Sequence, residues 1–230
     1  MDNKHLTLYR ADRRGNKTMP EKYYTDGLLT KQVNSGDDPE PHIKYGWLRT
    51  VLNHIHADTP ESEFIYETTA FLSFTSDKDR AFYFLTEANS KNWSTSDKKD
   101  GNAFIFTLHI PMKDLKELST GVYLLKYKCN YDRTRTDKKF LANIPIPVNC
   151  SLCSQLPDYE HEMLVINAPE YLFQFKDEYL IEYSSAVKDS EWLLLPKDPL
   201  FDGNTGIVSK GWQSRIHIAD FWSVDFFKTS

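Results

Sequence analysis

Hydrophobic and polar residues alternate along much of the chain, and this pattern predicts a strand-rich domain with few helices. Successive side chains of a strand face opposite sides of a sheet, so alternation indicates a half-buried strand. It predicts strands over residues 6–9, 70–75, 104–111, 122–128, 159–166, 171–175 and 179–183. Residues 47–54 have helix-like apolar spacing instead, and Ser76 is predicted to cap a second helix that runs through Ala81 and Phe84.

Polar segments separate these elements and suggest how the chain is organised. Residues 88–102 are rich in turn-forming side chains, and residues 144–158 hold three prolines, so both are predicted to be loops. The chain has 230 residues, of which 40% are hydrophobic and 27% charged, which is typical of a folded domain. We expect a catalytic domain over residues 1–190 and a C-terminal extension, residues 191–230, packed on it through aromatic side chains.

Charge and targeting signals narrow the possible partners. The formal net charge is -5, and no long run of Lys and Arg is present, which argues against a nucleic-acid partner. No stretch approaches the roughly 20 apolar residues that span a bilayer. The first five residues are polar and do not resemble a secretory signal.

The cysteines carry the only candidate metal motif. Three are present, Cys129, Cys150 and Cys153, and an odd number cannot all pair within one chain, which predicts a reducing compartment. The Cys150-x-x-Cys153 pair with Cys129 and a histidine could ligate zinc. A structural zinc site usually shows a second clear pair, so free thiols and no metal are the first expectation.

Candidate chemistry comes from an arginine near the N-terminus and a pair of glutamates far downstream. Arg10 ends the first predicted strand, and its planar guanidinium can bind phosphate oxygens at two points. Glu160 and Glu162 are two residues apart on a predicted strand, so both can face one reacting centre. Together they suggest an enzyme that acts on a dinucleotide.

Several segments in this order resemble the cholera-toxin-like mono-ADP-ribosyltransferases, over roughly residues 6–185. The resemblance is carried by the run Tyr9 to Arg14, the stretch from Met19-Pro20-Glu21 to Gly27-Leu28, Ser73-Phe74-Thr75, the strand Phe104 to Pro111, and Glu160-His161-Glu162. Ser73-Phe74-Thr75 departs from the family's Ser-Thr-Ser motif at its middle and last positions. The resemblance implies an α/β (α+β) ADP-ribosyltransferase fold, with two packed, mostly antiparallel sheets around an NAD cleft and flanking helices.

The implied activity is transfer of ADP-ribose from NAD to a protein side chain, with arginine favoured as acceptor and threonine or another hydroxyl second. Cleavage of the nicotinamide–ribose bond develops positive charge on the sugar, in an oxocarbenium-like transition state. The resemblance assigns Glu162 to stabilise that charge and Glu160 to meet the incoming nucleophile. It assigns Arg10 to the NAD phosphates or the adjacent ribose, with Asp12 and Arg14 as secondary members of the same cluster.

Hydroxyl groups and a histidine complete the expected site. Ser73 is expected to donate a hydrogen bond to Glu162, and Thr75 offers a second hydroxyl on the same face. His54 resembles the helix histidine of enterotoxin-type members, and a purely structural role for it is equally open. Tyr83 and Trp93 are candidates to stack on nicotinamide, although core or loop positions suit them better.

Rival functions stay open at this stage. Water in place of the protein acceptor would make the chain an NAD glycohydrolase. The altered Ser-Phe-Thr motif also fits a catalytically degenerate fold that binds a protein partner, and the cysteines fit a zinc-stabilised interaction protein. As a family member without a classical signal peptide, the chain is expected to be a secreted effector or toxin that acts in the cytosol of a target cell.

Overall fold

The computed structural model describes ten segments of the chain. They are residues 4–14, 28–29, 47–55, 71–85, 102–128, 160–196, 200–202, 206–209, 215–216 and 222–228. Their main feature is one sheet of eight strands in the order β12-β4-β1-β3-β8-β7-β6-β5, with every neighbouring pair antiparallel. Its strands are β1 (His5–Arg14), β3 (Leu72–Thr75), β4 (Asn102–Pro111), β5 (Leu115–Ser119), β6 (Val122–Tyr127), β7 (His161–Asn167), β8 (Glu191–Pro196) and β12 (Trp222–Lys228).

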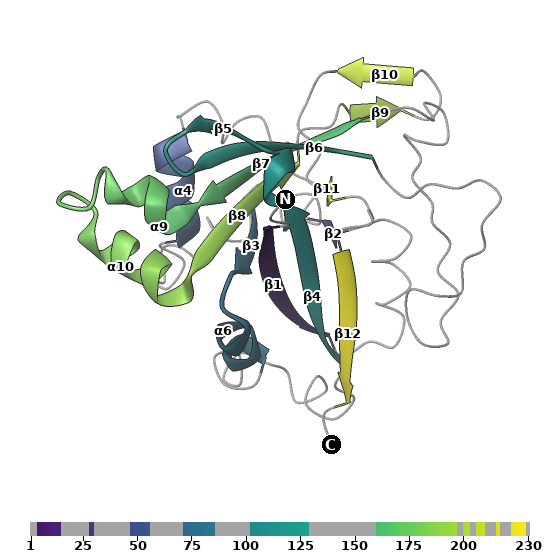
Figure 1. Cartoon of the computed structure of the whole chain (residues 1–230), viewed down its shortest axis with the longest axis horizontal. Helices are drawn as coiled ribbons and strands as arrows, with labels where there is room; N and C mark the ends of the chain where they lie inside the picture. Colours follow the sequence, from purple (N-terminus) through teal and green to yellow (C-terminus); the bar gives the residue numbers. More distant parts are fainter. Residues whose placement is uncertain are drawn as a thin grey trace.

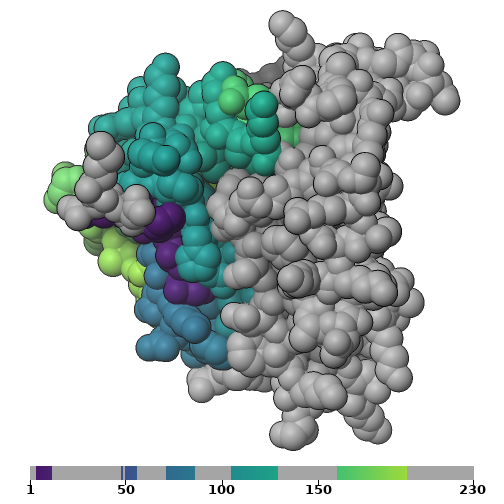
Figure 2. All heavy atoms as spheres, turned by 45° about the vertical axis from the view of Figure 1, so that its right-hand side comes forward, coloured from purple at the N-terminus to yellow at the C-terminus, as the bar shows by residue number. Residues whose placement is uncertain are grey.

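The sheet curls strongly along its length. In Figure 1, β4 and β12 lie upright with opposite directions, whereas β5 and β6 at the other end of the sheet lie across the page. Two short ribbons complete the strands, β10 (Gly206–Ser209) with β9 (Leu200–Asp202) and β11 (Arg215–Ile216) with β2 (Leu28–Leu29). In the space-filling view of Figure 2, β1 in purple lies between the teal residues of β4 to β6 and the blue residues of β3 and α6 (Lys78–Tyr83).

Helices are few and short, and three of them lie beside β7 and β8 on the left of Figure 1. These three are α4 (Trp47–Ile55), α9 (Ala168–Phe173) and α10 (Leu180–Asp189). The helix α6 follows β3 directly, and the 3-10 turn η2 (Met112–Asp114) joins β4 to β5. None of the helices in the described ranges is long and apolar enough to cross a membrane.

Apolar side chains cover both faces of the sheet, so its central strands are buried on both sides. One face packs a cluster that includes Leu8, Phe74, Phe106, Leu125, Met163 and Leu194. The opposite face packs a second cluster against the helices, including Val51, Leu164, Ile166, Leu172, Ala186 and Leu193. This burial on both faces explains the uninterrupted apolar run from Trp192 to Leu195, because alternation disappears when neither face meets water.

The fold confirms the predicted α+β class and the antiparallel pairing. Eight of the described strands form one curled sheet and four form two short ribbons, so the finer expectation of two packed sheets around a cleft stays a prediction. The predicted helix at residues 47–54 and the predicted strands that begin near residues 6, 70, 104, 122 and 159 are present, although β1 continues to Arg14, well beyond its expected end at residue 9. The predicted loops at 88–102 and 144–158 fall almost wholly outside the described residues, and only the final residue of the first is seen, at the start of β4.

Two predicted strands are wrong, since residues 171–175 and 179–183 belong to helical segments. Asn167 caps α9 by accepting a hydrogen bond from the amide of Glu170, and Pro169 occupies the first turn. An asparagine followed by a proline is a helix-start signal. The aromatic residues of the following segment favour a strand locally, yet they pack against the neighbouring helix, as in the contact between Phe173 and Tyr183.

The expected domain boundary at residue 190 is also corrected. Residues 191–196 form β8, which lies between β3 and β7 near the centre of the sheet, and β12 pairs with β4 at the edge. Residues 191–230 therefore supply integral strands of the domain and are not an added extension.

Candidate active site

Arg10 bridges β1 and β3 through its side chain. Its guanidinium Nη1 donates to the backbone carbonyl of Ser73 over 2.8 Å. In the β1–β3 register Tyr9 lies opposite Thr75. The hydrogen bond from the Arg10 side chain therefore adds a second link between the two strands, next to that pair. Arg10 Nε is buried and has no hydrogen-bond partner among the described residues, which leaves one donor of the guanidinium unsatisfied.

The Ser73 hydroxyl faces a histidine from the helix that covers β3. His54, in the last turn of α4, is almost fully buried, and its Nε2 lies 2.5 Å from Ser73 Oγ. Its ring is nearly perpendicular to that of Phe71, with ring centroids 5.7 Å apart. The helix therefore holds the imidazole in a fixed place over the serine.

Glu191 is the acid that the fold brings to Ser73 and His54. It is the first residue of β8 and lies opposite Thr75 in the β3–β8 register, which places its side chain on the Ser73 face. Glu191 Oε1 is 3.9 Å from His54 Nε2, and only 14% of the Glu191 side chain is exposed. Burial, with a smaller contribution from the negative charge of Asp189, raises the pKa of Glu191 to about 8, while a hydrogen bond with the Ser73 side chain acts in the opposite direction.

A tight turn connects α10 to this glutamate. Ser190 adopts a left-handed conformation with φ of 46°, which ends the helix so that β8 begins at the next residue. The turn also places Asp189 two residues before Glu191, and the Asp189 carboxylate pairs with the guanidinium of Arg80 on α6. The structure thus contains an acidic pair, Asp189-x-Glu191, next to Ser73.

The glutamate pair at 160 and 162 lies elsewhere on the sheet. Ser73 is opposite Leu193, which is opposite Ile166, so Glu162 is two strands away and four residues further along β7. Standard strand dimensions put its Cα roughly 15 Å from that of Ser73. The expected hydrogen bond from Ser73 to Glu162 is therefore wrong.

Glu160 and Glu162 instead surround a lysine on the neighbouring strand. Lys126 Nζ is 2.9 Å from Glu162 Oε1 and 3.8 Å from Glu160 Oε2, and Lys126 is opposite Glu162 in the β6–β7 register. The hydrogen bond with Glu162 and its charge raise the pKa of Lys126. Half of the Lys126 and Glu160 side-chain surfaces are exposed, so this group has the character of a solvated surface ion cluster.

Thr75 supports the backbone beside the site. It is buried, its Oγ1 donates to the carbonyl of Asp189 over 2.6 Å, and the same oxygen accepts the amide of Asp77 over 3.0 Å. The second hydroxyl of the Ser73-Phe74-Thr75 motif therefore holds the turn before Glu191, whereas Phe74 faces the opposite core, as expected from strand alternation.

The remaining candidates divide by whether the structure describes them. Asp12 and Arg14 lie in β1, and their side chains are outside the described part of the structure. The described ranges also exclude Trp93, Cys129, Cys150 and Cys153. Tyr83 is described, and the Arg80 guanidinium lies 4.3 Å from its ring centroid. Among the side chains that are described, no group of three or more His, Cys, Asp and Glu is arranged to hold a metal ion.

The sequence held a signal for the acidic pair at Asp189 and Glu191, and this pair was missed as a candidate. Two acids two residues apart precede the apolar run Trp192 to Leu195, and such a run indicates a strand buried on both faces. An acid at the first position of a buried strand lies at the edge of the core, where its pKa is easily perturbed. Glu162 likewise precedes an apolar run, Met163 to Ile166, so this signal does not by itself separate the two acidic pairs.

The short contact between Ser73 and His54 also invites comparison with a Ser-His-acid triad. In a triad the acid binds the ring nitrogen opposite to the one that faces the serine. Here Ser73 and Glu191 both approach His54 at Nε2. The arrangement is therefore suited to fixing a carboxylate by a hydroxyl, and it does not reproduce the geometry that activates a serine nucleophile.

Comparisons of the chain with models of protein families, with curated proteins and with solved structures found no match. The function of the chain is accordingly inferred from the geometry around Ser73 and from the sequence motifs.

Proposed function

We propose that the chain is an NAD-dependent mono-ADP-ribosyltransferase in which Glu191, and not Glu162, is the catalytic glutamate. The observation that carries this proposal is the convergence of three groups on β1, β3 and β8. Arg10 binds the Ser73 backbone, and the Ser73 hydroxyl lies between His54 and the side chain of Glu191. An arginine, a serine and a glutamate are the three parts that the sequence resemblance requires, and a different glutamate now completes the set.

The Arg10 side chain provides a test of whether an NAD phosphate fits. A buried guanidinium nitrogen without a partner is costly, and a phosphate or ribose oxygen is an acceptor that would satisfy it. One guanidinium nitrogen is already held by the Ser73 carbonyl, so the remaining donors have a fixed orientation. This arrangement supports a role for Arg10 in binding the phosphates or the adjacent ribose.

Glu191 supplies the group that the proposed chemistry needs. NAD, when bound, supplies a ribose whose bond to nicotinamide breaks with positive charge developing on the sugar. A carboxylate in a site of low water content stabilises such charge more strongly than one in solvent. Because burial raises the Glu191 pKa to about 8, the free protein holds much of this group protonated at neutral pH, and a nearby cationic ligand would favour its ionised form.

Ser73 and His54 would keep Glu191 in place during the reaction. The Ser73 hydrogen bond favours the charged form of Glu191, and the almost fully buried His54 excludes water from one side. Preorganised partners of this kind reduce the reorganisation that the reaction would otherwise require.

The acceptor in this proposal is a protein side chain. Asp189 occupies the position two residues before Glu191 that the resemblance gives to the acid facing the acceptor, and arginine remains the favoured acceptor with a hydroxyl side chain second. The chain would then act as an effector in the cytosol of a target cell.

Labelled NAD tests the proposal. The parent, Glu191→Gln and Glu162→Gln proteins are incubated with NAD labelled in its adenylate phosphate and with a cell lysate. We expect label on protein with the parent and with Glu162→Gln, and none with Glu191→Gln. Label found only in free ADP-ribose would show a glycohydrolase, and no consumption of NAD by the parent would contradict the proposed function.

A further inference from the structure

The turn that precedes Glu191 is fastened to the junction between β3 and α6. Thr75 Oγ1 donates to the carbonyl of Asp189 over 2.6 Å, and the amide of Ser76 donates to the carbonyl of Ser190 over 3.0 Å. Arg80, one turn into α6, donates from Nε to Asp189 Oδ1 over 2.7 Å, and its Nη2 contacts the same oxygen. Two backbone carbonyls and one side chain of the turn are thus held from a single neighbouring segment.

These hydrogen bonds matter because the backbone of the turn has an unfavourable conformation. Ser190 has a positive φ of 46°, a region that residues with a Cβ adopt infrequently and retain only when their surroundings fix them. A shift at Ser190 would be passed directly to Glu191, the next residue, and so to its contacts with Ser73 and His54. The bonds to Asp189 and Ser190 are therefore well placed to determine where the Glu191 carboxyl lies.

Arg80 is itself held firmly. Its guanidinium lies 4.3 Å from the ring centroid of Tyr83 and 4.7 Å from that of Phe84, and its side chain is only 17% exposed. Stacking on two rings limits the rotamers of the side chain, so the ion pair with Asp189 loses little further entropy. This pair is more ordered than an ordinary surface ion pair.

We propose that Arg80 is a positioning residue, which holds the Asp189–Ser190 turn through the Asp189 carboxylate and thereby fixes Glu191 against Ser73 and His54. The inference rests on the proposed function, because it assigns Arg80 a part in that reaction through Glu191. It also assigns α6 a role beyond packing, since the helix carries the cation that compensates the acid beside the site.

The charges around Glu191 give the proposal a measurable electrostatic consequence. Among the described residues, the groups that face Glu191 are Ser73 from β3, His54 from α4 and Asp189 from the preceding turn, and Arg80 from α6 neutralises Asp189. The Asp189 charge disfavours ionisation of Glu191. Loss of the Arg80 cation would leave that charge uncompensated, and the Glu191 pKa would rise further.

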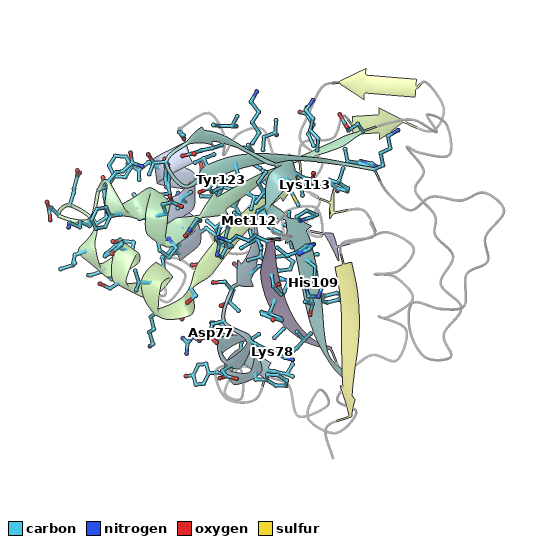
Figure 3. The ribbon with its side chains drawn as sticks, in the orientation of Figure 1. Asp77, Lys78, His109, Met112, Lys113 and Tyr123 are labelled. Atoms are coloured by element: carbon cyan, nitrogen blue, oxygen red, sulfur yellow. The ribbon has the colours of Figure 1, made fainter. Side chains whose placement is uncertain are left out.

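The test compares Arg80→Gln and Arg80→Lys with Lys78→Gln, which removes an exposed cation from the same helix. Figure 3 shows Lys78 next to Asp77 at the start of α6. Thermal unfolding establishes that each variant is folded. Nicotinamide release then gives kcat, KM and their pH dependence, and carbon-13 NMR of labelled glutamate, assigned with Glu191→Gln, follows Glu191 without NAD.

For Arg80→Gln we expect kcat to fall about 10- to 100-fold, with KM for NAD changed by less than about threefold, as for a misplaced catalytic group. We also expect the midpoint of the Glu191 titration to move upward by about half a pH unit or more. Arg80→Lys keeps the charge without the planar fork, so its titration stays near that of the parent while kcat is intermediate. Lys78→Gln matches the parent in both measurements.

An unchanged Glu191 titration and an unchanged kcat in folded Arg80→Gln would overturn the proposal. So would equal effects of Lys78→Gln. If Arg80→Gln fails to fold, Arg80→Lys carries the same test through its kcat. A parent without NAD turnover would remove the proposed function, while the NMR titration would still show whether Arg80 acts on Glu191.

Discussion

At the level of single residues, the site is defined by the surroundings of Glu191 and Glu162. Both are the second acid of a pair spaced two residues apart. The Glu162 side chain is 32% exposed and paired with Lys126, whereas Glu191 is less than half as exposed and lies beside Ser73 and His54. A buried acid with a perturbed pKa indicates a functional site more reliably than the spacing of two acids along the chain does.

The titration of Glu191 predicts how stability depends on pH. The ordinary pKa of 4.5 is raised to about 8 in the folded protein, so between these values the unfolded chain releases the proton while the folded protein keeps it. This contribution to stability is complete below about pH 4.5 and is lost as the pH rises towards 8. Glu191→Gln cannot titrate and is expected to gain about 2 to 3 kcal/mol relative to the parent between pH 5.5 and pH 8.

Urea unfolding of both proteins at these two pH values measures the difference. Glu162→Gln serves as the matched control, because it makes the same substitution on a neighbouring strand. A difference between Glu191→Gln and the parent that stays constant from pH 5.5 to pH 8 would contradict a strongly raised pKa.

At the level of elements, the start of α6 was predicted within one residue, but the residue that caps the helix is not the one expected. The sequence favoured Ser76, but Asp77 caps the helix by accepting hydrogen bonds from the amides of Asp79 and Arg80. The amide of Ser76 instead donates to the carbonyl of Ser190, beside the paired ends of β3 and β8. A long-range contact of this kind cannot be read from local sequence.

Replacement of the cap is expected to destabilise the protein moderately. Asp77→Ala removes two hydrogen bonds to the helix N-terminus and should cost about 1 kcal/mol, whereas Ser76→Ala keeps its backbone bond and should cost less than about half of that. Chemical denaturation of the two variants and the parent provides the comparison. A larger loss for Ser76→Ala would show that the sequence had indicated the correct cap.

The turn between β5 and β6 requires a glycine. Gly121 has φ of +72°, and a Cβ placed on it would lie 2.6 Å from the backbone nitrogen of Tyr171 on α9. Gly121→Ala would therefore force the hairpin away from α9 and is expected to cost about 2 to 4 kcal/mol. The exposed neighbour Thr120 offers a control, Thr120→Ala, for which unfolding should change by less than about 0.5 kcal/mol. Equal midpoints of unfolding for the two variants would argue against this close approach.

At the level of the whole molecule, the position of β8 determines both the fold and the site. The strand lies between β3 and β7, its residues Leu193, Leu194 and Leu195 are fully buried, and its first residue is Glu191. A chain that ends at residue 190 would lose this strand and leave the edges of β3 and β7 unpaired. We expect that truncated chain to lack cooperative unfolding and dispersed amide signals in NMR, whereas a stable, folded fragment would contradict the central place of β8.

The same strand explains which parts of the molecule could be predicted. Local patterns identified β1, β4 and α4, and the sequence resemblance selected Arg10 and Ser73, which the structure brings into contact through the Ser73 carbonyl. The partner acid depends on strand order, because β8 lies next to β3 although more than 100 residues separate Ser73 from Glu191. Hydrophobic periodicity contains no information about that order, so the choice between the two acidic pairs needed the assembled sheet.

The rate of nicotinamide release from NAD, measured for Glu191→Gln and Glu162→Gln beside the parent, tests the central claim most directly. The two variants carry the same substitution, and thermal unfolding confirms that each is folded before the rates are compared. Loss of a carboxylate that stabilises the transition state is expected to lower kcat about 1000-fold for Glu191→Gln, while Glu162→Gln stays within about threefold of the parent. The reverse result, with Glu162→Gln inactive and Glu191→Gln active, would contradict the assignment of Glu191 as the catalytic glutamate.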